Sequence, residues 1–564
     1  KLSALAERLE GDWPAGNTGI GHTRWATHGK PSDINAHPHM DCPGEIVVIH
    51  NGIVENHQEL KKRLASEGHR FVSETDTEVI PHLIEGYLGK GLSLRDAVRE
   101  TIRLLQGAHA IVVMSKREPD RLIAARVGNA GGVVVGFGNG EKLVASDLPA
   151  LLPHTREVIF LADQELAELS ANGIAILDSA GQELKKKTVS LSYDPISAAK
   201  GSYKHFMLKE MMEQPEVILD SIRGRVDFEA DTVSLDHIGL SRQQLRSFSR
   251  VVLLGMGTSL HAAMVGQRYF ERIARIPAEV DNASEFRYRD AVLRAETLLV
   301  AVTQSGETVD TLAAMEEARA KGVPQIVVCN VEGSQASRLA EGVVYTRCGL
   351  EIGVCSTKTF TASLIALYLL ACYLGKERGT LSAARARELI RPLARVPYLI
   401  GEVTKASGEY ERLAHQFSRY NNFLYLGRGL QYPIALEGAL KLKEVSYIHA
   451  EGYPAGEMKH GPIALIDSDM PVVALAPRDD LYDKMMSNIE QVKAREGLVI
   501  AIGNEGDKEL ARKADQVIYL PETSPLLAPV FTVIPLQFFA YYIALRRGCD
   551  VDQPRNLAKT VTVE

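Results

Sequence analysis

The chain has 564 residues, too many for one hydrophobic core, so we expect two to four domains. Its 45% hydrophobic and 24% charged residues are typical of a globular protein, and a net charge of −7 argues against nucleic acid or an anionic membrane as a partner. The six cysteines form no C-x-x-C pair, which gives no zinc or redox motif and favours a reducing, cytoplasmic location. The longest apolar runs, 360–375 and 530–545, are shorter than a membrane span, and we interpret both as buried helices.

The N-terminal third, residues 1–192, alternates short helical patterns with apolar strands. The strands are predicted at 45–50, 110–115, 132–137 and 158–161. This mixture indicates a layered α+β domain. The following segment, 193–202, has the sequence YDPISAAKGS, whose Pro, Gly and Ser residues indicate a linker.

Beyond the linker, apolar strands alternate with long helices, a pattern typical of a parallel α/β sheet. The pattern occurs twice: VVLLGMG begins at Val251 and FLYLGRG begins at Phe423, and a later pair of strands keeps nearly the same offset. Such self-similarity indicates a duplicated unit. We predict two tandem doubly wound domains at 203–390 and 391–549, followed by a tail at 550–564.

Two loops rich in hydroxyl groups follow adjacent strands of the first repeat: GMGTS at 255–259 and TQSGET at 303–308. Parallel sheets bind ligands at the carboxyl ends of their strands, and helix N-termini with nearby glycines attract anions. For either loop alone, simple helix capping by Ser and Thr is the favoured interpretation, but the two together favour a phosphate site. The second repeat has APRDDL at 476–481, with two carboxylates and no hydroxyl, so we expect phosphate binding only in the first repeat.

Glu437, Lys441 and Glu444 lie at positions i, i+4 and i+7, on one face of a predicted helix. On spacing alone, the favoured interpretation is an exposed stripe of salt bridges. A loop with the sequence GEMKHG, which contains His460, follows soon after.

Four motifs, HTRWATHG at 22–29, GALKLKE at 438–444, GEMKHG at 456–461 and the tail DVDQPRNLAKTVTVE, resemble the glucosamine-6-phosphate synthases, and the resemblance covers essentially the whole chain. It implies an α/β protein: a four-layer α+β glutaminase domain of the N-terminal-nucleophile type, then two sugar isomerase (SIS) domains. It also implies conversion of fructose 6-phosphate and glutamine to glucosamine 6-phosphate and glutamate, the first step of hexosamine synthesis, with no metal and no organic cofactor.

The resemblance assigns roles in the isomerase half. Glu444 moves a proton between C1 and C2 of the sugar, and Lys441 assists. His460 opens the sugar ring and in this family comes from the neighbouring subunit, which implies a homodimer. The tail is a lid that carries Lys559, which forms a Schiff base with the open-chain sugar. The implied sugar-phosphate contacts are Thr258, Ser259, Thr303, Gln304, Ser305, Thr308, Val354, Ser356 and Ala558.

In the glutaminase half, the implied glutamine-binding residues are Arg24, Trp25, His28, Asn51, Gly52 and Asp76. Arg24 suits a bidentate grip on the carboxylate of glutamine, and Asn51 with Gly52 suits an oxyanion hole. The family attacks glutamine with an N-terminal Cys, whereas residue 1 is Lys. We therefore expect that the N-terminal segment is absent and that the chain as given lacks glutamine hydrolysis, with free ammonia as the remaining nitrogen source.

Two alternatives compete with this interpretation. A non-catalytic phosphosugar-binding SIS regulator needs only the phosphate loops, so Glu444, His460 and Lys559 argue against it. Another amidotransferase of the same class, acting on phosphoribosyl diphosphate, is disfavoured because a pyrophosphate site requires more cationic groups and usually Mg²⁺.

Overall fold

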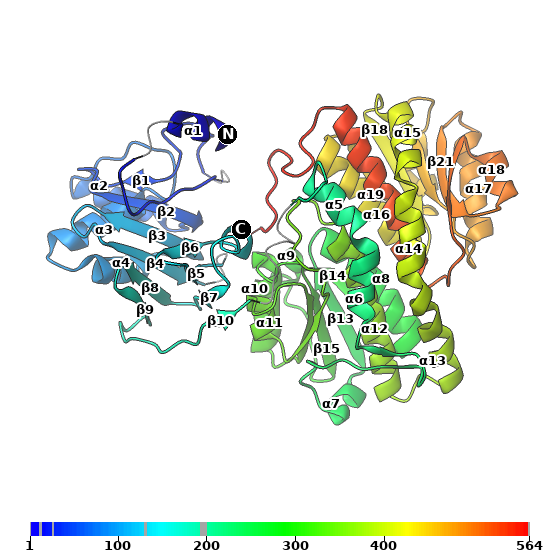
Figure 1. The fold of residues 1–564 in the computed structure, drawn as a ribbon, viewed down its shortest axis with the longest axis horizontal. Helices are drawn as coiled ribbons and strands as arrows, with labels where there is room; N and C mark the ends of the chain where they lie inside the picture. Colours follow the sequence, from blue (N-terminus) through cyan, green and yellow to red (C-terminus); the bar gives the residue numbers. More distant parts are fainter. Residues whose placement is uncertain (1, 11–13, 25–27, 129–131, 192–199, 562–564) are drawn as a thin grey trace. The chain divides into compact units, whose positions relative to one another are not determined.

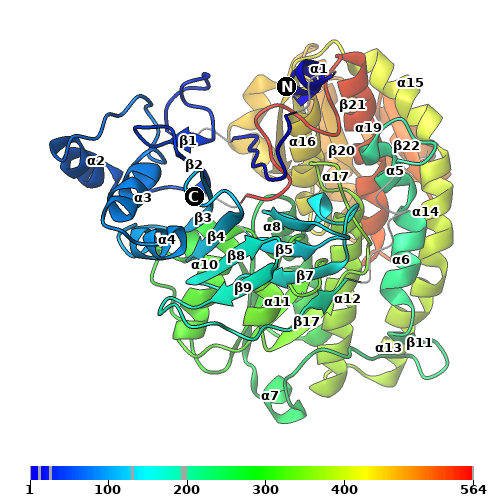
Figure 2. The same cartoon turned by 60° about the vertical axis from the view of Figure 1, so that its left-hand side comes forward.

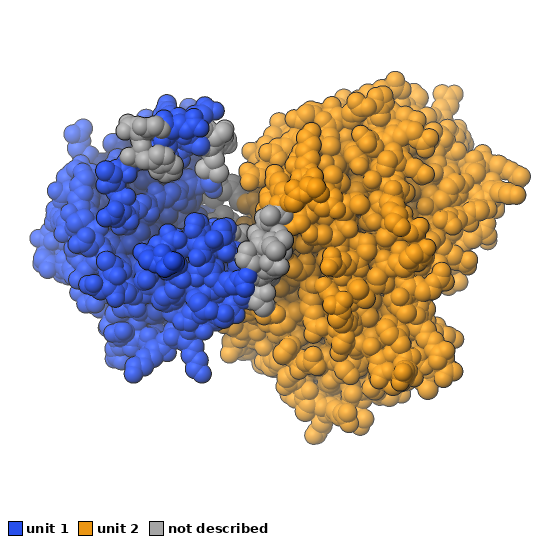
Figure 3. Space-filling model, viewed as in Figure 1, with its two compact units in different colours: residues 1–192, 562–564 blue, residues 193–561 orange. Residues whose placement is uncertain are grey.

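A computed structural model of the chain describes residues 2–10, 14–24, 28–128, 132–191 and 200–561 (Figure 1). The chain divides into two compact units, residues 1–192 with 562–564 and residues 193–561 (Figure 3). Each unit has its own sheets and its own hydrophobic core. Most of the predicted linker, 193–202, lies outside the described residues.

The first unit contains two antiparallel sheets and a group of helices. The larger sheet has the order β1-β2-β3-β4-β8-β9. Its strands are β1 His39–Met40, β2 Ile46–Gly52, β3 His109–Ser115, β4 Arg121–Val127, β8 Glu165–Ser170 and β9 Gly173–Leu177. The smaller sheet, in the order β10-β7-β5-β6, contains β5 Val134–Phe137, β6 Lys142–Ala145, β7 Glu157–Phe160 and β10 Val189–Ser190. The helices are α1 Leu2–Leu9, α2 His57–Ser66, α3 Val79–Gly89 and α4 Leu94–Ile102.

Side chains alternate between the two faces of the larger sheet, so each face packs against a different layer. In β4, Ile123 and Ala125 join the core beneath α2, α3 and α4, whereas Ala124 faces the core shared with the smaller sheet (Figure 1). Successive side chains of a strand point to opposite faces, so one strand serves two cores. The described residues therefore form a helix layer, a sheet and a second sheet, three of the four expected layers.

The second unit contains two five-stranded parallel sheets with the same topology. Their orders are β14-β13-β15-β16-β17 and β19-β18-β20-β21-β22. The first contains β13 Arg250–Gly255, β14 Ala278–Asn282, β15 Thr297–Val302, β16 Gln325–Cys329 and β17 Gly342–Tyr345. The second contains β18 Asn422–Gly427, β19 His449–Pro454, β20 Val472–Leu475, β21 Val499–Asn504 and β22 Gln516–Leu520. The predicted internal repeat is confirmed, strand for strand.

Helices cover both faces of these sheets, so every residue of β15 and of β16 is buried, as expected for central parallel strands. The central helices are α8 Thr258–Tyr269, α12 Lys358–Glu377, α16 Gln431–Ser446 and α19 Ala528–Arg546. The others are α5 Phe206–Met212, α6 Gln214–Ile222, α7 Arg242–Ser247, α9 Ala283–Phe286, α10 Val309–Ala320, α11 Gln335–Leu339, α13 Ala383–Ile390, α14 Val396–Lys405, α15 Ser407–Phe417, α17 Tyr482–Lys493 and α18 Lys508–Lys513. A short hairpin, β11 Val226–Asp227 and β12 Thr232–Val233, accompanies them.

The two apolar helices α12 and α19 pass a length-and-composition test for a membrane span, but 94% and 89% of their apolar windows are buried inside the protein. This confirms the interpretation of 360–375 and 530–545 as buried helices. Core helices of globular proteins commonly show this composition.

A single hydrophobic core joins the two repeats. Leu253 and Val300 of the first sheet belong to the same buried cluster as Tyr425 and Val473 of the second. Helix α8 packs against α16, its counterpart in the second repeat, and α6 lies beside α14 (Figure 2). The two repeats are therefore one structural body, with the first helices of both in direct contact.

Candidate active site

The loop at 303–308 connects β15 to α10 in the first repeat. Gly306 has φ of 71°, and a Cβ there would lie 2.1 Å from the Ser334 hydroxyl, so glycine is required. Ser305 Oγ accepts a hydrogen bond from the Glu307 N–H at 3.1 Å. Thr308 occupies the N-cap position of α10 without a side-chain capping bond, so the capping alternative does not account for its hydroxyl.

The loop at 255–259 brings the first helix of this repeat to the second. Gly257, with φ of 50°, immediately precedes α8, and Thr258 and Ser259 form its first turn. Thr258 Oγ1 donates a hydrogen bond to Glu437 Oε1 on α16 at 3.0 Å. One of the predicted sugar-phosphate contacts is thus hydrogen-bonded to the face of α16 that carries the predicted catalytic carboxylate.

That face of α16 is mostly buried. Glu437 and Lys441 have no exposed side-chain surface, whereas Glu444 is 22% exposed. Lys441 Nζ lies 3.3 Å from Glu437 Oε1 and 2.6 Å from Glu444 Oε2, and it donates to Thr258 Oγ1 at 3.1 Å. The alternative of an exposed salt-bridge stripe is therefore wrong for these residues.

The two carboxylates of this face have different environments. Burial raises the pKa of Glu437, but Lys441, His261 Nδ1 at 2.7 Å and Thr258 outweigh it and lower the pKa. Burial lowers the pKa of Lys441, but Glu437 and Glu444 outweigh it and raise the pKa above its ordinary value. Glu437 and Lys441 therefore form a charged buried pair, and Glu444 is the carboxylate that reaches the surface.

The loop at 351–358 holds the predicted Schiff-base lysine. Buried Glu351 accepts hydrogen bonds from the Thr357 N–H at 2.9 Å and from Lys559 Nζ at 2.6 Å. Ser356 Oγ donates to the same carboxylate at 3.0 Å, and Lys559 Nζ also donates to Gly353 O at 2.8 Å. Burial raises the pKa of Glu351, but Lys559 and the backbone N–H donors lower it to about 2.

Two backbone hydrogen bonds hold the C-terminal tail, one at the 351–358 loop and one at the start of α10. The Val354 N–H donates to Asp552 O at 3.0 Å, and the Val309 N–H at the start of α10 donates to Val561 O at 3.1 Å. Lys559 and Ala558 therefore lie on a strap between the 351–358 loop and the end of the 303–308 loop. These contacts hold the tail against the rest of the second unit through the protein's own backbone hydrogen bonds.

Burial and the neighbouring Glu444 raise the pKa of the Cys355 thiol, so the 351–358 loop also approaches the exposed end of the α16 face. The structure thus brings together the predicted phosphate loops, the Lys441–Glu444 pair and Lys559. His460 lies in the exposed turn η5 Glu457–His460 and makes no hydrogen bond or ion pair with any described residue of this group.

Three further residues of this site, Glu210, His261 and Glu351, were not predicted from the sequence. Glu351 pairs with Lys559, and His261 pairs with Glu437. Glu210 on α5 is buried and accepts from the Gly353 N–H at 3.0 Å; burial and Glu351 raise its pKa to about 7. The contact partner of each of these residues lies more than 140 positions away in the sequence. Only Glu351 carries a local signal, because it precedes the Val354–Ser356 segment.

In the first unit, the predicted glutamine-binding residues cluster at the end of β2. His22 Nε2 lies 2.7 Å from Asn51 Oδ1. Gly52 has φ of 136°, and a Cβ there would lie 2.1 Å from Ala108 O, so this position requires glycine. Asp76 Oδ2 accepts from the Val54 N–H at 2.7 Å, and His28 Nδ1 lies 3.8 Å from Asp76 Oδ1.

The Arg24 side chain hydrogen-bonds to the backbone of its own loop. Its φ is 46°, and its guanidinium donates to His28 O at 2.6 Å and to Gly29 O at 2.9 Å. Its expected grip on the glutamine carboxylate stays a prediction. Trp25 lies outside the described residues.

Protein-family models match both halves of the chain. A SIS domain model matches residues 244–373 and 416–547, and a glutamine amidotransferase domain model matches residues 5–189. These matches lie within the predicted ranges of the three domains. They confirm the fold class: a glutaminase domain followed by tandem SIS domains.

Relatives match along the full chain. The chain is 46% identical to the glutamine–fructose-6-phosphate aminotransferase [isomerizing] of Caldanaerobacter subterraneus subsp. tengcongensis and 49% identical to that of Aquifex aeolicus, covering 100% of this chain and 92% of each relative. The C-terminal domain of glucosamine-fructose-6-phosphate aminotransferase from Francisella tularensis covers 63% of this chain and 100% of its own, with a TM-score of 0.60 and 38% identity. The chain belongs to the family of isomerizing glutamine–fructose-6-phosphate aminotransferases.

Proposed function

We propose that this chain converts fructose 6-phosphate and glutamine to glucosamine 6-phosphate and glutamate, the first step of hexosamine synthesis. The observation that carries the proposal is that Lys441, paired with Glu444, meets the hydroxyl-rich 255–259 loop at Thr258, while the strap that carries Lys559 ends beside the hydroxyl-rich 303–308 loop. A site that only senses a phosphosugar has no use for a buried ammonium that is 2.6 Å from a partly exposed carboxylate.

Phosphate is proposed to bind at the loops 255–259 and 303–308. Backbone N–H groups at the start of α8 and α10 give the positive potential, and hydroxyls supply directional donors. Thr308 is the strongest candidate because its side chain is not used as a cap. Val354, Ser356 and Ala558 are proposed to contact the sugar from the strap side.

Lys559 is proposed to attack C2 of the open-chain sugar. The attack forms a C–N bond and releases the carbonyl oxygen as water; ammonia then takes the place of the lysine, which is regenerated. The Lys559 ammonium is held by Glu351 at 2.6 Å, so the sugar must displace this contact before the amine reacts.

Glu444 is proposed to carry the proton between C1 and C2, because it is the partly exposed carboxylate of the α16 face. Lys441 is held in place by the buried Glu437 and orients Glu444 through their ion pair. His460 is exposed, which supports its proposed role in a homodimer, where it would reach the site of the neighbouring subunit.

The match to a glutamine amidotransferase domain gives no support to the expected lack of glutamine hydrolysis. Glutamine is therefore the proposed nitrogen donor, bound by Arg24, His28, Asn51, Gly52 and Asp76. The proposed location is the cytoplasm, whose reducing conditions fit six free thiols.

The test is to incubate the purified protein with fructose 6-phosphate and either glutamine or ammonium, and to identify products by mass spectrometry. Glucosamine 6-phosphate from both donors supports the whole proposal. Product from ammonium alone would limit the activity to the isomerase half. Phosphosugar binding without product from either donor would favour a non-catalytic SIS regulator instead.

A further inference from the structure

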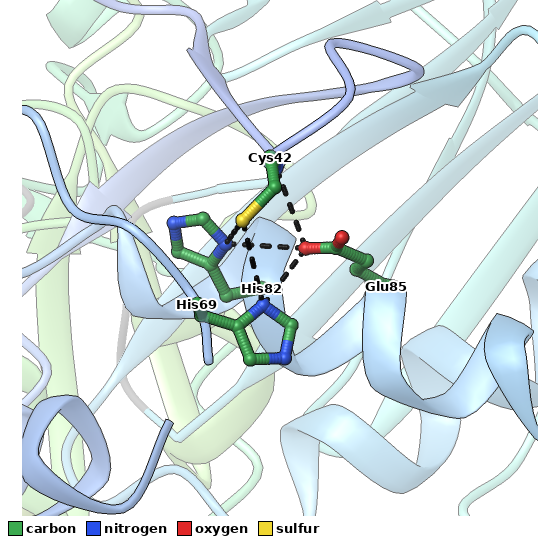
Figure 4. A group of neighbouring side chains, drawn as sticks. All are labelled: Cys42, His69, His82 and Glu85. Atoms are coloured by element: carbon green, nitrogen blue, oxygen red, sulfur yellow. Dashed lines mark hydrogen bonds and ion pairs between the residues drawn. The ribbon is translucent and has the colours of Figure 1, made fainter. Parts of the chain in front are cut away.

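Four side chains of the first unit, none of them a predicted glutamine-binding residue, converge on one point (Figure 4). They are Cys42 in the β1–β2 turn, His69 after α2, and His82 and Glu85 on α3. Their ligand atoms, Sγ, two Nδ1 and a carboxylate oxygen, all lie within 4.8 Å of one another. We propose that this cluster is a binding site for Zn²⁺ or a similar tetrahedral divalent ion.

The distances fit a tetrahedral ion. Zinc bonds of about 2.3 Å to sulfur and about 2.0–2.1 Å to nitrogen or oxygen give tetrahedral edges of about 3.6 Å for S–N and about 3.3 Å for N–O. Cys42 Sγ lies 3.8 Å from His69 Nδ1 and 3.6 Å from His82 Nδ1. Glu85 Oε2 lies 2.9 Å from His69 Nδ1 and 3.3 Å from His82 Nδ1.

Neighbouring groups match those that support zinc ligands. The Arg70 backbone N–H donates to Cys42 Sγ at 3.4 Å, which stabilises a thiolate. The other ring nitrogen of buried His82, Nε2, lies 3.8 Å from Glu78 Oε1. A carboxylate beside the second nitrogen favours the tautomer that leaves Nδ1 available for the metal.

A hydrogen-bonded cluster without an ion is the competing interpretation. In it, Glu85 Oε2 accepts from both imidazoles and from the Cys42 N–H at 3.3 Å. That arrangement uses the carboxylate but gives the sulfur, besides the Arg70 N–H, only long contacts to two ring nitrogens. An ion uses all four groups, and sulfur with imidazole is the ligand set that zinc prefers.

The site would join three segments that are distant in sequence. The residues between His69 and His82 include Asp76, a proposed glutamine contact, and Glu78, which accepts from the Ser73 N–H at 2.8 Å. Binding would therefore fix both ends of the segment that carries Asp76. The expectation of no metal rested on the family resemblance and on the lack of a C-x-x-C pair, and ligands at 42, 69, 82 and 85 form no such pair.

Cobalt(II) gives the direct test, because tetrahedral cobalt absorbs visible light and a thiolate ligand adds a near-ultraviolet charge-transfer band. The full chain, freed of metal by a chelator, should bind one equivalent of Co²⁺ with both signatures, and Zn²⁺ should bleach them. Zinc should also raise the melting temperature, because a ligand that binds only the folded state stabilises it.

Cys42→Ser is the main variant, because Cys42 is exposed and the change leaves the core intact. Even loss of an outer-shell partner weakens metal binding by about 10–100-fold, so loss of this ligand should weaken zinc at least tenfold and remove the charge-transfer band. His69→Gln should also weaken zinc. Cys549→Ser, at the other partly accessible thiol, is the matched control and should change neither measurement. Absence of the thiolate band, or equal affinity in Cys42→Ser, would overturn the proposal.

Discussion

The two SIS repeats share a strand order but differ in the chemistry at equivalent loops. After β15, the first repeat has Thr303–Thr308, a hydroxyl-rich loop that ends at the N-cap of α10. After β20, the second repeat has Asp479, whose Oδ1 accepts from the Leu481 N–H of its own loop at 2.8 Å. The first helices of the two repeats also differ. Helix α16 of the second repeat carries the Lys441–Glu444 pair, whereas α8 of the first repeat supplies Thr258 and His261, which hydrogen-bond to Glu437 beside that pair.

We propose that duplication preserved the frame while the two copies took different roles, the first holding the phosphate and the second moving the proton. Because α8 packs against α16, the two proposed functions would meet at one site. The predictions below test this division.

The largest effect is expected at Lys559, which the strap brings to the first repeat. Borohydride with fructose 6-phosphate should add one reduced sugar phosphate to the peptide that contains Lys559. Lys559→Arg should abolish the adduct and the activity, because a guanidinium stays protonated and cannot form the imine. Peptide mass spectrometry makes the measurement. Labelling at Lys441 instead would remove Lys559 from the proposed role.

The two carboxylates of α16 should respond differently. Glu444→Gln should lower kcat by about 100-fold or more with little change in melting temperature, because it removes the proposed proton carrier. Glu437→Gln should instead destabilise the fold by about 3–5 kcal/mol, because it leaves Lys441 in a buried site without its fully buried partner. Steady-state kinetics measure the loss of kcat, and thermal unfolding measures the loss of stability. Near-normal isomerisation by Glu444→Gln would contradict the assignment.

The phosphate loops give a matched comparison between the repeats. Ser305→Ala and Thr308→Ala should each raise the KM for fructose 6-phosphate, since a hydrogen bond to a charged group contributes about 1.5–3 kcal/mol. Asp479→Ala and Asp480→Ala, at the equivalent loop, should leave KM nearly unchanged. If both pairs of variants raise KM equally, the proposed division of work between the repeats is wrong.

The smallest effect concerns pH. Burial and Glu351 raise the pKa of Glu210 to about 7, so its contribution to stability is full below the unfolded-state value near 4.5 and is lost as pH rises through about 7. Glu210→Gln removes this dependence. The melting temperature of the variant relative to the native protein should therefore rise between pH 5 and pH 7. A constant difference over that range would contradict the assigned pKa.

Much of the fold was predictable because its signals are local. The GMG and GRG turns after apolar strands indicated the repeat, and the topology confirms it. The motif around Glu444 indicated the helix that carries the proposed catalytic residues, but the burial of Glu437 and Lys441 was not predictable, because it depends on packing against Thr258 and His261 of another repeat.

Other parts of the site were beyond sequence reasoning for the same physical reason. Glu351 and Lys559 are 208 positions apart, and their contact depends on where the strap crosses the 351–358 loop. Arg24 has a left-handed backbone, and its guanidinium donates to the carbonyls of its own loop, a contact that the residue type does not predict. Both features follow from chain geometry that residue types alone do not specify.

The core shared by the two repeats has a consequence for synthesis on the ribosome. The apolar surfaces of α8 and α12 are completed by α16 and α19, and α19 ends about 170 residues after α12. At about 5–20 residues per second, the first repeat must wait about 10–30 s before its partner surface has been made. During that interval it presents unburied apolar surface, so we expect the nascent first repeat to be prone to aggregation and to chaperone binding.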